Sequence, residues 1–301
     1  MWKRIAKWTA LVVGVLIAAV AAFVLVEVIR FDRSTSRVYD VPVPAIVRST
    51  DPAVIARGKH LAESLGECTV CHGASMGGGR AEPLGPLGTM IIPNVTSGRD
   101  GRLAAYSDGE LARLIRHGIK RDGRTVRLMP STNCAWWPDE DVIALVSWLR
   151  TVPPVDGDPG VVELSVTAKV LDRLDAIPID VARRIDHTST TRPPPPSPDA
   201  RYGAFVATSC RGCHGATLAG GPIPGAPPGL PVPLNLTRHE TGLKGWTYDD
   251  FLALLRDGRR KNGKPLDPFM PVESLRNMNE IETRALWAYL QSVPPRPFGE
   301  R

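Results

Sequence analysis

A five-residue motif of two cysteines and a histidine occurs twice in this 301-residue sequence and constrains its fold more than any other feature. The two copies are Cys68-Thr69-Val70-Cys71-His72 and Cys210-Arg211-Gly212-Cys213-His214, which lie nearly half the chain apart. Other segments recur at almost the same offset: Asn94-Val95-Thr96 with Asn235-Leu236-Thr237, Met129-Pro130 with Met270-Pro271, and Val152-Pro153-Pro154 with Val293-Pro294-Pro295. Self-similarity at a nearly fixed offset indicates two copies of one domain.

Each copy has the pattern of short helices separated by long loops, so we expect both domains to be all-α. Asp51-Pro52 and Ser197-Pro198 resemble a helix cap followed by proline at the first helical position. Ser107 to Glu110 and Thr247 to Asp250 each have the spacing of a capping box. Val142, Leu145, Val146 and Leu149 follow one face of a helix.

The repeat predicts a first domain at 50–155 and a second at 198–297, joined by a proline-rich linker at 156–197. Four consecutive prolines at 193–196 should act as a stiff spacer. The partly apolar segment 161–185 is compatible with a free linker and with one that lies on a domain surface. The loops 77–93 and 220–233 are too long for compact domains of this size unless each wraps around a large group.

The C-x-x-C-H motif is the attachment sequence of a c-type haem. Two thiols spaced by one helical turn form thioethers to the porphyrin, and the adjacent histidine ligates the iron. We therefore predict covalent attachment at the cysteine pairs Cys68/Cys71 and Cys210/Cys213, with His72 and His214 as iron ligands. A zinc site would need a further pair of ligands in each copy, and a thioredoxin-like redox pair would not explain the histidine.

Methionine is the expected sixth ligand in both copies. Met129 follows His72 at almost the same spacing at which Met270 follows His214, and proline comes directly after each methionine. Met76, Met90 and Met278 have no methionine at the matching position of the other copy. Two methionines at matched places in two haem domains favour His/Met ligation of both irons.

The remaining histidines and the fifth cysteine do not repeat. We expect solvated surface positions for four histidines: His60, His117, His187 and His239. Cys134 is expected to be a small buried hydrophobic residue, although pairing with another chain is an alternative in an oxidising compartment. The Asn-x-Thr segments match the glycosylation pattern, but their place in the repeat favours a role in a loop beside the haem.

The N-terminal segment has the pattern of a membrane anchor. Lys3, Arg4 and Lys7 precede an apolar run from Trp8 to Val26, which at about 1.5 Å per residue just crosses a hydrocarbon core of about 30 Å. A cleaved signal peptide is the alternative, since Ala19-Val20-Ala21 resembles a cleavage site. We predict an uncleaved transmembrane anchor at 1–30, with the following residues translocated because the basic side stays cytoplasmic. The net charge of +6 includes these N-terminal groups and does not indicate nucleic-acid binding.

From about Pro52 to Pro295 the chain resembles the cytochrome c subunits of bacterial membrane-bound alcohol, aldehyde and sugar-acid dehydrogenases. The resemblance is carried by C-x-x-C-H, the Asn-x-Thr turn, an Arg-x-Gly segment at Arg116 and Arg256, Met-Pro, and a last helix that ends in Val-Pro-Pro. It implies two tandem cytochrome c domains after a transmembrane helix, with two covalently bound haem c groups. Such subunits usually have three haem domains, whereas this sequence contains two attachment motifs.

The resemblance also implies a function and a location. A membrane-anchored di-haem cytochrome c would transfer electrons from a dehydrogenase or other donor to the respiratory chain through a terminal oxidase or quinol-linked complex. Its soluble domains would face the periplasm from the bacterial inner membrane. With His72 and Met129 on one iron and His214 and Met270 on the other, neither iron has an open position, which favours a carrier over an enzyme.

Two other functions are compatible with the motifs. A di-haem enzyme, such as a peroxidase or sulfur-compound dehydrogenase, would need one iron with a vacant or labile position. An assembly or sensing module would use its haems only to keep the domains folded. A carrier predicts two similar low-spin haems, whereas an enzyme predicts one labile or high-spin haem.

Overall fold

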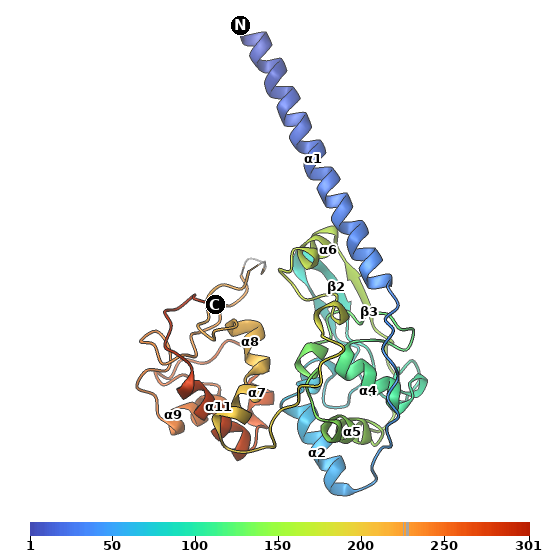
Figure 1. Cartoon of the computed structure of the whole chain (residues 1–301), viewed down its shortest axis with the longest axis vertical. Coiled ribbons are helices and arrows are strands. Elements are labelled where there is room, and N and C mark those ends of the chain that lie inside the picture. Colours follow the sequence, from blue (N-terminus) through green and yellow to red (C-terminus); the bar gives the residue numbers. More distant parts are fainter. Residues whose placement is uncertain (225, 227–228) are drawn as a thin grey trace.

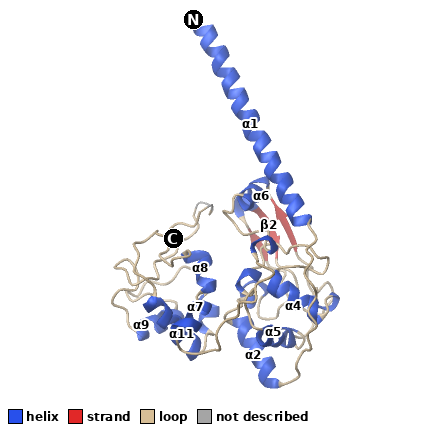
Figure 2. Ribbon diagram, in the orientation of Figure 1, coloured by secondary structure: helices blue, strands red, loops and turns tan. Residues whose placement is uncertain are grey.

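A computed structural model describes residues 1–224, 226 and 229–301. A long N-terminal helix projects from one of two bodies that lie side by side (Figure 1). The first body contains the first repeat and most of the linker, and the second body contains the second repeat. Helices and loops form nearly all of both bodies, with one small sheet in the first (Figure 2).

Helix α1 (Trp2–Ser36) is apolar and largely exposed. It is the one helix in the described part of the chain that is long and apolar enough to cross a membrane. The helix ends at Ser36, beyond the predicted end of the anchor at residue 30. The extra turns pack on α6 (Val166–Arg173), where Phe31 is fully buried against Ala168 and Ile179. This apolar contact holds the base of the anchor on the first body.

The first repeat contains four helices that surround its core. They are α2 (Pro52–Glu63), α3 (Cys68–His72), α4 (Asp108–His117) and α5 (Asp139–Leu149). Short 3-10 turns lie at Gly85–Leu87, Leu103–Ala105 and Ser131–Asn133. The predicted caps are confirmed: Asp51 accepts a hydrogen bond from the amide of Ala53, and Ser107 with Glu110 forms a capping box.

The second repeat has helices at matching places: α7 (Ala200–Val206), α8 (Thr208–His214), α9 (Tyr248–Asp257), α10 (Val272–Arg276) and α11 (Glu280–Ser292). Thr247 and Asp250 form the predicted capping box of α9. The predicted start at Ser197-Pro198 is wrong. Asp199 caps α7 instead, because its carboxylate accepts from the amides of both Arg201 and Tyr202.

The first and last helices cross closely in each repeat, α2 on α5 and α7 on α11. Glycine is required at both crossings. A Cβ atom on Gly58 would lie 1.9 Å from the carbonyl oxygen of Ala144, and one on Gly203 would lie 1.9 Å from that of Ala285. The two backbones therefore touch, which lets the apolar faces of α5 and α11 close over separate hydrophobic cores.

The first body is not purely helical, which differs from the all-α expectation. Strands β1 (Ala81–Pro83), β2 (Gly88–Ile91) and β3 (Val161–Leu164) form an antiparallel sheet in the order β1-β2-β3. The linker supplies β3, so the loop after α3 gains a partner from a distant part of the sequence. Part of the corresponding loop of the second repeat, 220–233, lies outside the described residues.

The linker lies across the surface of the first body, which answers a question that the sequence left open. Ile179, Val181 and Ala182 are buried there, and the amide of Leu128 donates a 3.2 Å hydrogen bond to the carbonyl of Ile179. Asp172 is fully buried and accepts hydrogen bonds from the amides of Ile179 and Asp180. The linker is therefore an integral layer of the first body up to about Ile185.

We expect Gly58→Ala to destabilise the first repeat by about 1–3 kcal/mol, because the new methyl group forces α2 and α5 apart. Thermal unfolding of the full-length protein, followed by circular dichroism, measures the change. Lys59→Ala on the exposed face of the same helix is the control and should change the stability by less than about 0.5 kcal/mol. Equal unfolding temperatures for G58A and the unsubstituted protein would contradict the close crossing.

Candidate haem-attachment sites

Both attachment motifs form a short helix that ends at glycine. The first is α3 (Cys68–His72), preceded by Glu67 in the left-handed conformation with φ 52° and followed by Gly73 with φ 74°. The second is the end of α8, followed by Gly215 with φ 85°. No disulfide joins any of the five cysteines in the described part of the chain. One helical turn separates the two thiols of each pair, as thioether attachment to a single porphyrin requires.

The two motif histidines are held in the same way. Nδ1 of His72 lies 3.0 Å from the carbonyl oxygen of Pro93, and Nδ1 of His214 lies 2.7 Å from that of Leu234. A carbonyl only accepts, so Nδ1 carries the proton and donates, which leaves the lone pair on Nε2. Metal-ligating histidines are oriented in this manner. Burial lowers the pKa of both imidazoles, so each is neutral at pH 7 and able to ligate iron.

Burial also distinguishes these cysteines from a redox pair. It raises the pKa of the Cys68 and Cys210 thiols to about 12 each. A thioredoxin-like nucleophile needs a lowered thiol pKa, because the thiolate is the reactive form. The described residues gather no group of three or more His, Cys, Asp or Glu side chains suited to a metal ion, which leaves the zinc alternative without a ligand set.

The predicted distal methionines lie in matching turns. Met129 packs against the same hydrophobic core as Cys68, and Met270 against the same core as Cys210. The carbonyl of Met129 accepts a 2.8 Å hydrogen bond from the amide of Ser131, and that of Met270 accepts a 2.7 Å bond from Val272. Each repeat therefore brings its first cysteine and its methionine to one apolar core, and His/Met ligation stays a prediction.

The Asn-x-Thr segments tie the loop behind each histidine to the chain that follows the last helix. Asn94 Nδ2 and Thr96 Oγ1 both donate to the carbonyl of Val155, at 2.6 and 3.0 Å. Asn235 and Thr237 bond the carbonyl of Arg296 in the same way, at 2.8 and 3.2 Å. All four side chains are buried. Their burial favours the loop role over glycosylation.

Three histidines that we expected on the surface have partners in the fold. Nε2 of His60 lies 2.8 Å from Oε1 of Glu282, a carboxylate that is only 1% exposed and belongs to the other repeat. Nδ1 atoms of His117 and His187 are 3.2 Å apart, and burial lowers the pKa of His117 to about 4. These contacts join segments far apart in the sequence, so no local pattern predicted them.

Three non-repeating sulfur residues pack in the hydrophobic cores: Cys134, Met76 and Met278. Cys134 is buried in the core of the first repeat, as predicted. Met76 and Met278 are 2% and 3% exposed and belong to the cores of the first and second repeats. Met76 has Leu218 as its counterpart in the second repeat, and both residues have a positive φ. The carbonyl of Met76 accepts a hydrogen bond from the amide of Val95, and that of Leu218 accepts one from the amide of Leu236.

Comparison with known proteins agrees with this geometry. Residues 53–149 match the family described as cytochrome c oxidase, cbb3-type, subunit III. The chain is 27% identical to the cytochrome c subunit of the alcohol dehydrogenase (quinone) of Gluconacetobacter polyoxogenes, over 82% of this chain and 57% of the relative. It is 26% identical to the cytochrome subunit of the fructose dehydrogenase of Gluconobacter japonicus, over 85% of this chain and 55% of the relative.

A third relative is the cytochrome c subunit of the alcohol dehydrogenase (quinone) of Gluconobacter oxydans strain 621H, which is 26% identical over 85% of this chain. The chain spans less than two thirds of each of these relatives, between 55% and 58% of their length. The relatives are named as cytochrome subunits of dehydrogenases, and the family match covers most of the first repeat.

We expect Asn94→Ala to destabilise the first repeat by about 1–3 kcal/mol, because it leaves the buried carbonyl of Val155 and the amide of Thr96 with fewer partners. Asn235→Ala should have the same effect on the second repeat. Thermal unfolding with detection in the haem absorption region measures both. Asn262→Ala, at an exposed turn, is the control and should change little. Unfolding of N94A at the original temperature would show that the buried network does not support the fold.

Proposed function

We propose that this chain, whose residues 53–149 match the family described as cytochrome c oxidase, cbb3-type, subunit III, binds one haem c in each repeat and works as a di-haem electron carrier. Cys68 and Cys71 attach one haem, and Cys210 and Cys213 attach the other. His72 and His214 are the proximal iron ligands. Met129 and Met270 are the distal ligands.

The orientation of the two motif histidines carries this proposal. Each imidazole donates Nδ1–H to a backbone carbonyl further along the chain, at Pro93 or Leu234, and keeps Nε2 for a metal. A histidine that only filled a core would not need the same tautomer in both repeats. The matched positions of Met129 and Met270 support ligation of each iron from its second face.

A carrier is the function that this ligand set supports. Haem supplies a one-electron couple, and a methionine ligand raises its potential. The protein residues exclude water with two apolar cores and hold each imidazole by a hydrogen bond. One histidine nitrogen and one methionine sulfur would then bind each iron. Neither iron would keep an open coordination position for a substrate. A peroxidase or sulfur-compound dehydrogenase would need such a position.

The relatives and α1 support a proposal for the partner and the location. We propose that the donor is a membrane-bound dehydrogenase and that the acceptor is a terminal oxidase or quinol-linked complex. Helix α1 anchors the chain in a bacterial inner membrane, with both repeats in the periplasm. The basic residues Lys3, Arg4 and Lys7 precede the apolar run and favour this orientation.

Met129→Ala should open one iron, and Met270→Ala should open the other. Each variant is expected to lose the weak far-red band of sulfur-to-iron ligation for one haem, to show a lower potential for that haem, and to bind carbon monoxide there. Optical spectra and redox titration measure these effects. Met278→Ala is the matched control, because Met278 is buried in the core of the second repeat but lies outside the proposed ligand set.

Two results would contradict the carrier proposal. One is a high-spin haem in the unsubstituted protein, which would favour a di-haem enzyme. The other is a M270A spectrum that retains both sulfur-to-iron bands. Mass spectrometry of the unsubstituted protein gives the number of attached haems, and a mass with a single haem would refute the second site.

Deleting residues 2–26 behind a cleavable signal should release the protein from the membrane with unchanged haem spectra, because the deletion removes the apolar span and keeps the turns that dock on α6. Deleting 2–36 should release it too, but with stability lowered by about 1.5–3 kcal/mol, because Phe31 is lost from its buried site. Membrane fractionation and thermal unfolding test both. A mature protein that begins near Ala22 would show that the segment is cleaved.

A further inference from the structure

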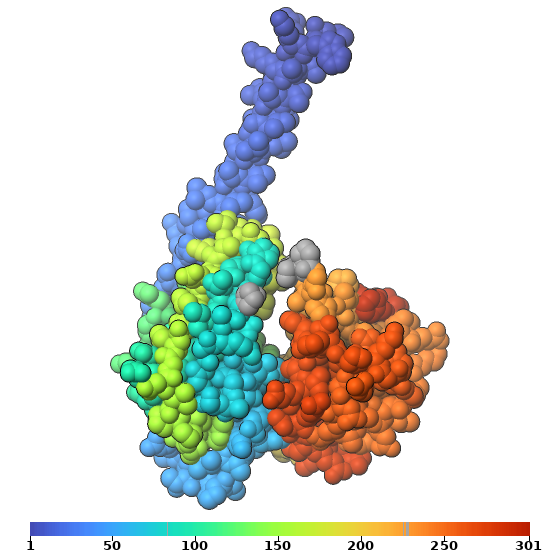
Figure 3. Space-filling model, turned by 180° about the vertical axis from the view of Figure 1, so that it is seen from behind, coloured from blue at the N-terminus to red at the C-terminus, as the bar shows by residue number. Residues whose placement is uncertain are grey.

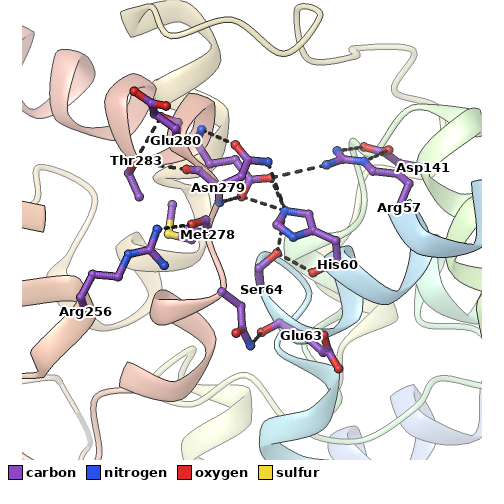
Figure 4. Close-up of polar contacts among 12 residues, drawn as sticks. Arg57, His60, Glu63, Ser64, Asp141, Arg256, Met278, Asn279, Glu280 and Thr283 are labelled. Carbon is purple, nitrogen blue, oxygen red and sulfur yellow. Dashed lines mark hydrogen bonds and ion pairs between the residues drawn. The ribbon is translucent and has the colours of Figure 1, made fainter. Parts of the chain in front are cut away.

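The two bodies meet through a specific polar contact. Arg57 on α2 forms a bidentate ion pair with Asp141 on α5, with N–O distances of 2.9 and 3.0 Å (Figure 4). Its remaining nitrogen lies 3.4 Å from Glu282 on α11, in the second repeat. His60 and Asn279 lie at the same place (Figure 4). Because Glu282 is buried, these partners fix how the second repeat sits on α2.

Apolar side chains complete the interface. Leu65 and Phe205 each pack against the cores of both repeats. The side-chain amide of Asn277 donates a 3.0 Å hydrogen bond to the carbonyl of Glu63. The second repeat contacts the region of α2 in the space-filling view (Figure 3). The interface therefore lies directly beside the first attachment motif, which begins at Cys68.

The two attachment motifs approach each other at this interface. Helix α3, which carries the first motif, contacts α10 of the second repeat. A cavity of about 10 Å³ lies between the repeats and has Glu67 on one side and Ser209 and Cys210 on the other. Glu67 and Ser209 are each the residue that precedes the first cysteine of a motif. Glu67 and Ser209, which are equivalent positions of the two repeats, therefore face each other across the cavity.

Glu67 is the ionisable group at this junction. It is partly buried, and among the described residues no hydrogen bond or ion pair to its carboxyl group is found. Burial raises its pKa to about 7. Its charge helps to raise the pKa of the thiols on both sides of the junction, Cys68 and Cys71 in the first repeat and Cys210 and Cys213 in the second. One carboxylate therefore acts electrostatically on both attachment motifs.

We propose that Glu67 is a charge shared by the two haem sites and that it sets both reduction potentials together. Oxidation adds one positive charge at the iron, and a nearby carboxylate at low dielectric stabilises that charge. Glu67 therefore lowers the reduction potentials of both haems. A carboxylate beside only one haem would lower that potential alone and make the two potentials differ. Similar potentials let an electron pass between the two sites in either direction. The proposal rests on the two haem sites of the proposed function.

The test is a redox titration of the full-length, haem-loaded protein and its Glu67→Gln variant at pH 9, above the pKa that burial gives this carboxyl group. Loss of the charge should raise both midpoint potentials. Glu63→Gln is the matched control, because it removes the same charge from the side chain that pairs with Lys59 on α2. It should shift both potentials by much less. A shift of only one potential, or of neither, in E67Q overturns the proposal.

Ser209→Glu gives a second measurement if E67Q does not fold. It places a carboxylate on the other side of the same cavity and should lower both potentials, whereas unchanged potentials would overturn the shared-charge proposal. Mass spectrometry of each protein separates this outcome from failure of the proposed function. A mass with fewer than two haems refutes the di-haem proposal itself, and two haems with unshifted potentials refute only the role of Glu67.

Discussion

The contact between the first and last helices of each repeat is the constraint on which the rest of the structure depends. Gly58 and Gly203 allow the helix backbones to touch the carbonyls of Ala144 and Ala285. This crossing closes a hydrophobic core around Leu61 and Leu145 in the first repeat, and a separate core in the second. The attachment helices follow α2 and α7 directly, so the crossing also fixes where each motif begins.

Hydrogen bonds from a few buried side chains then hold the long loops that helices alone would leave free. The Asn-x-Thr segments bond the chain after the last helix, and the residue before each segment, Pro93 or Leu234, accepts the hydrogen bond of the motif histidine. The orientation of each imidazole is thereby coupled to the end of the domain. Such buried networks are costly to break, because a carbonyl left without a partner has also lost its solvation.

The contacts between the two repeats are made by positions at which the repeats differ in sequence. Arg57, His60 and Glu67 lie in the first repeat only, and Tyr202, Phe205 and Ser209 stand at the corresponding places of the second. Arg57 and His60 contact buried Glu282, and Glu67 lines the cavity beside Cys210. The two repeats therefore have similar motif sites, and the positions at which they differ form the interface between them.

The sequence by itself determined the features whose chemistry is local. The motif spacing, the capping boxes, the apolar face of α5 and the span at the N-terminus are readable because each depends on residues that are close together in the chain. Tertiary structure decided what joins distant segments. Strand β3 pairs with β2, Phe31 docks on α6, and Glu67 faces Cys210 across the interface. These contacts depend on how separate segments pack. Residues that meet in this way have no characteristic separation along the sequence, so no sequence pattern indicates them.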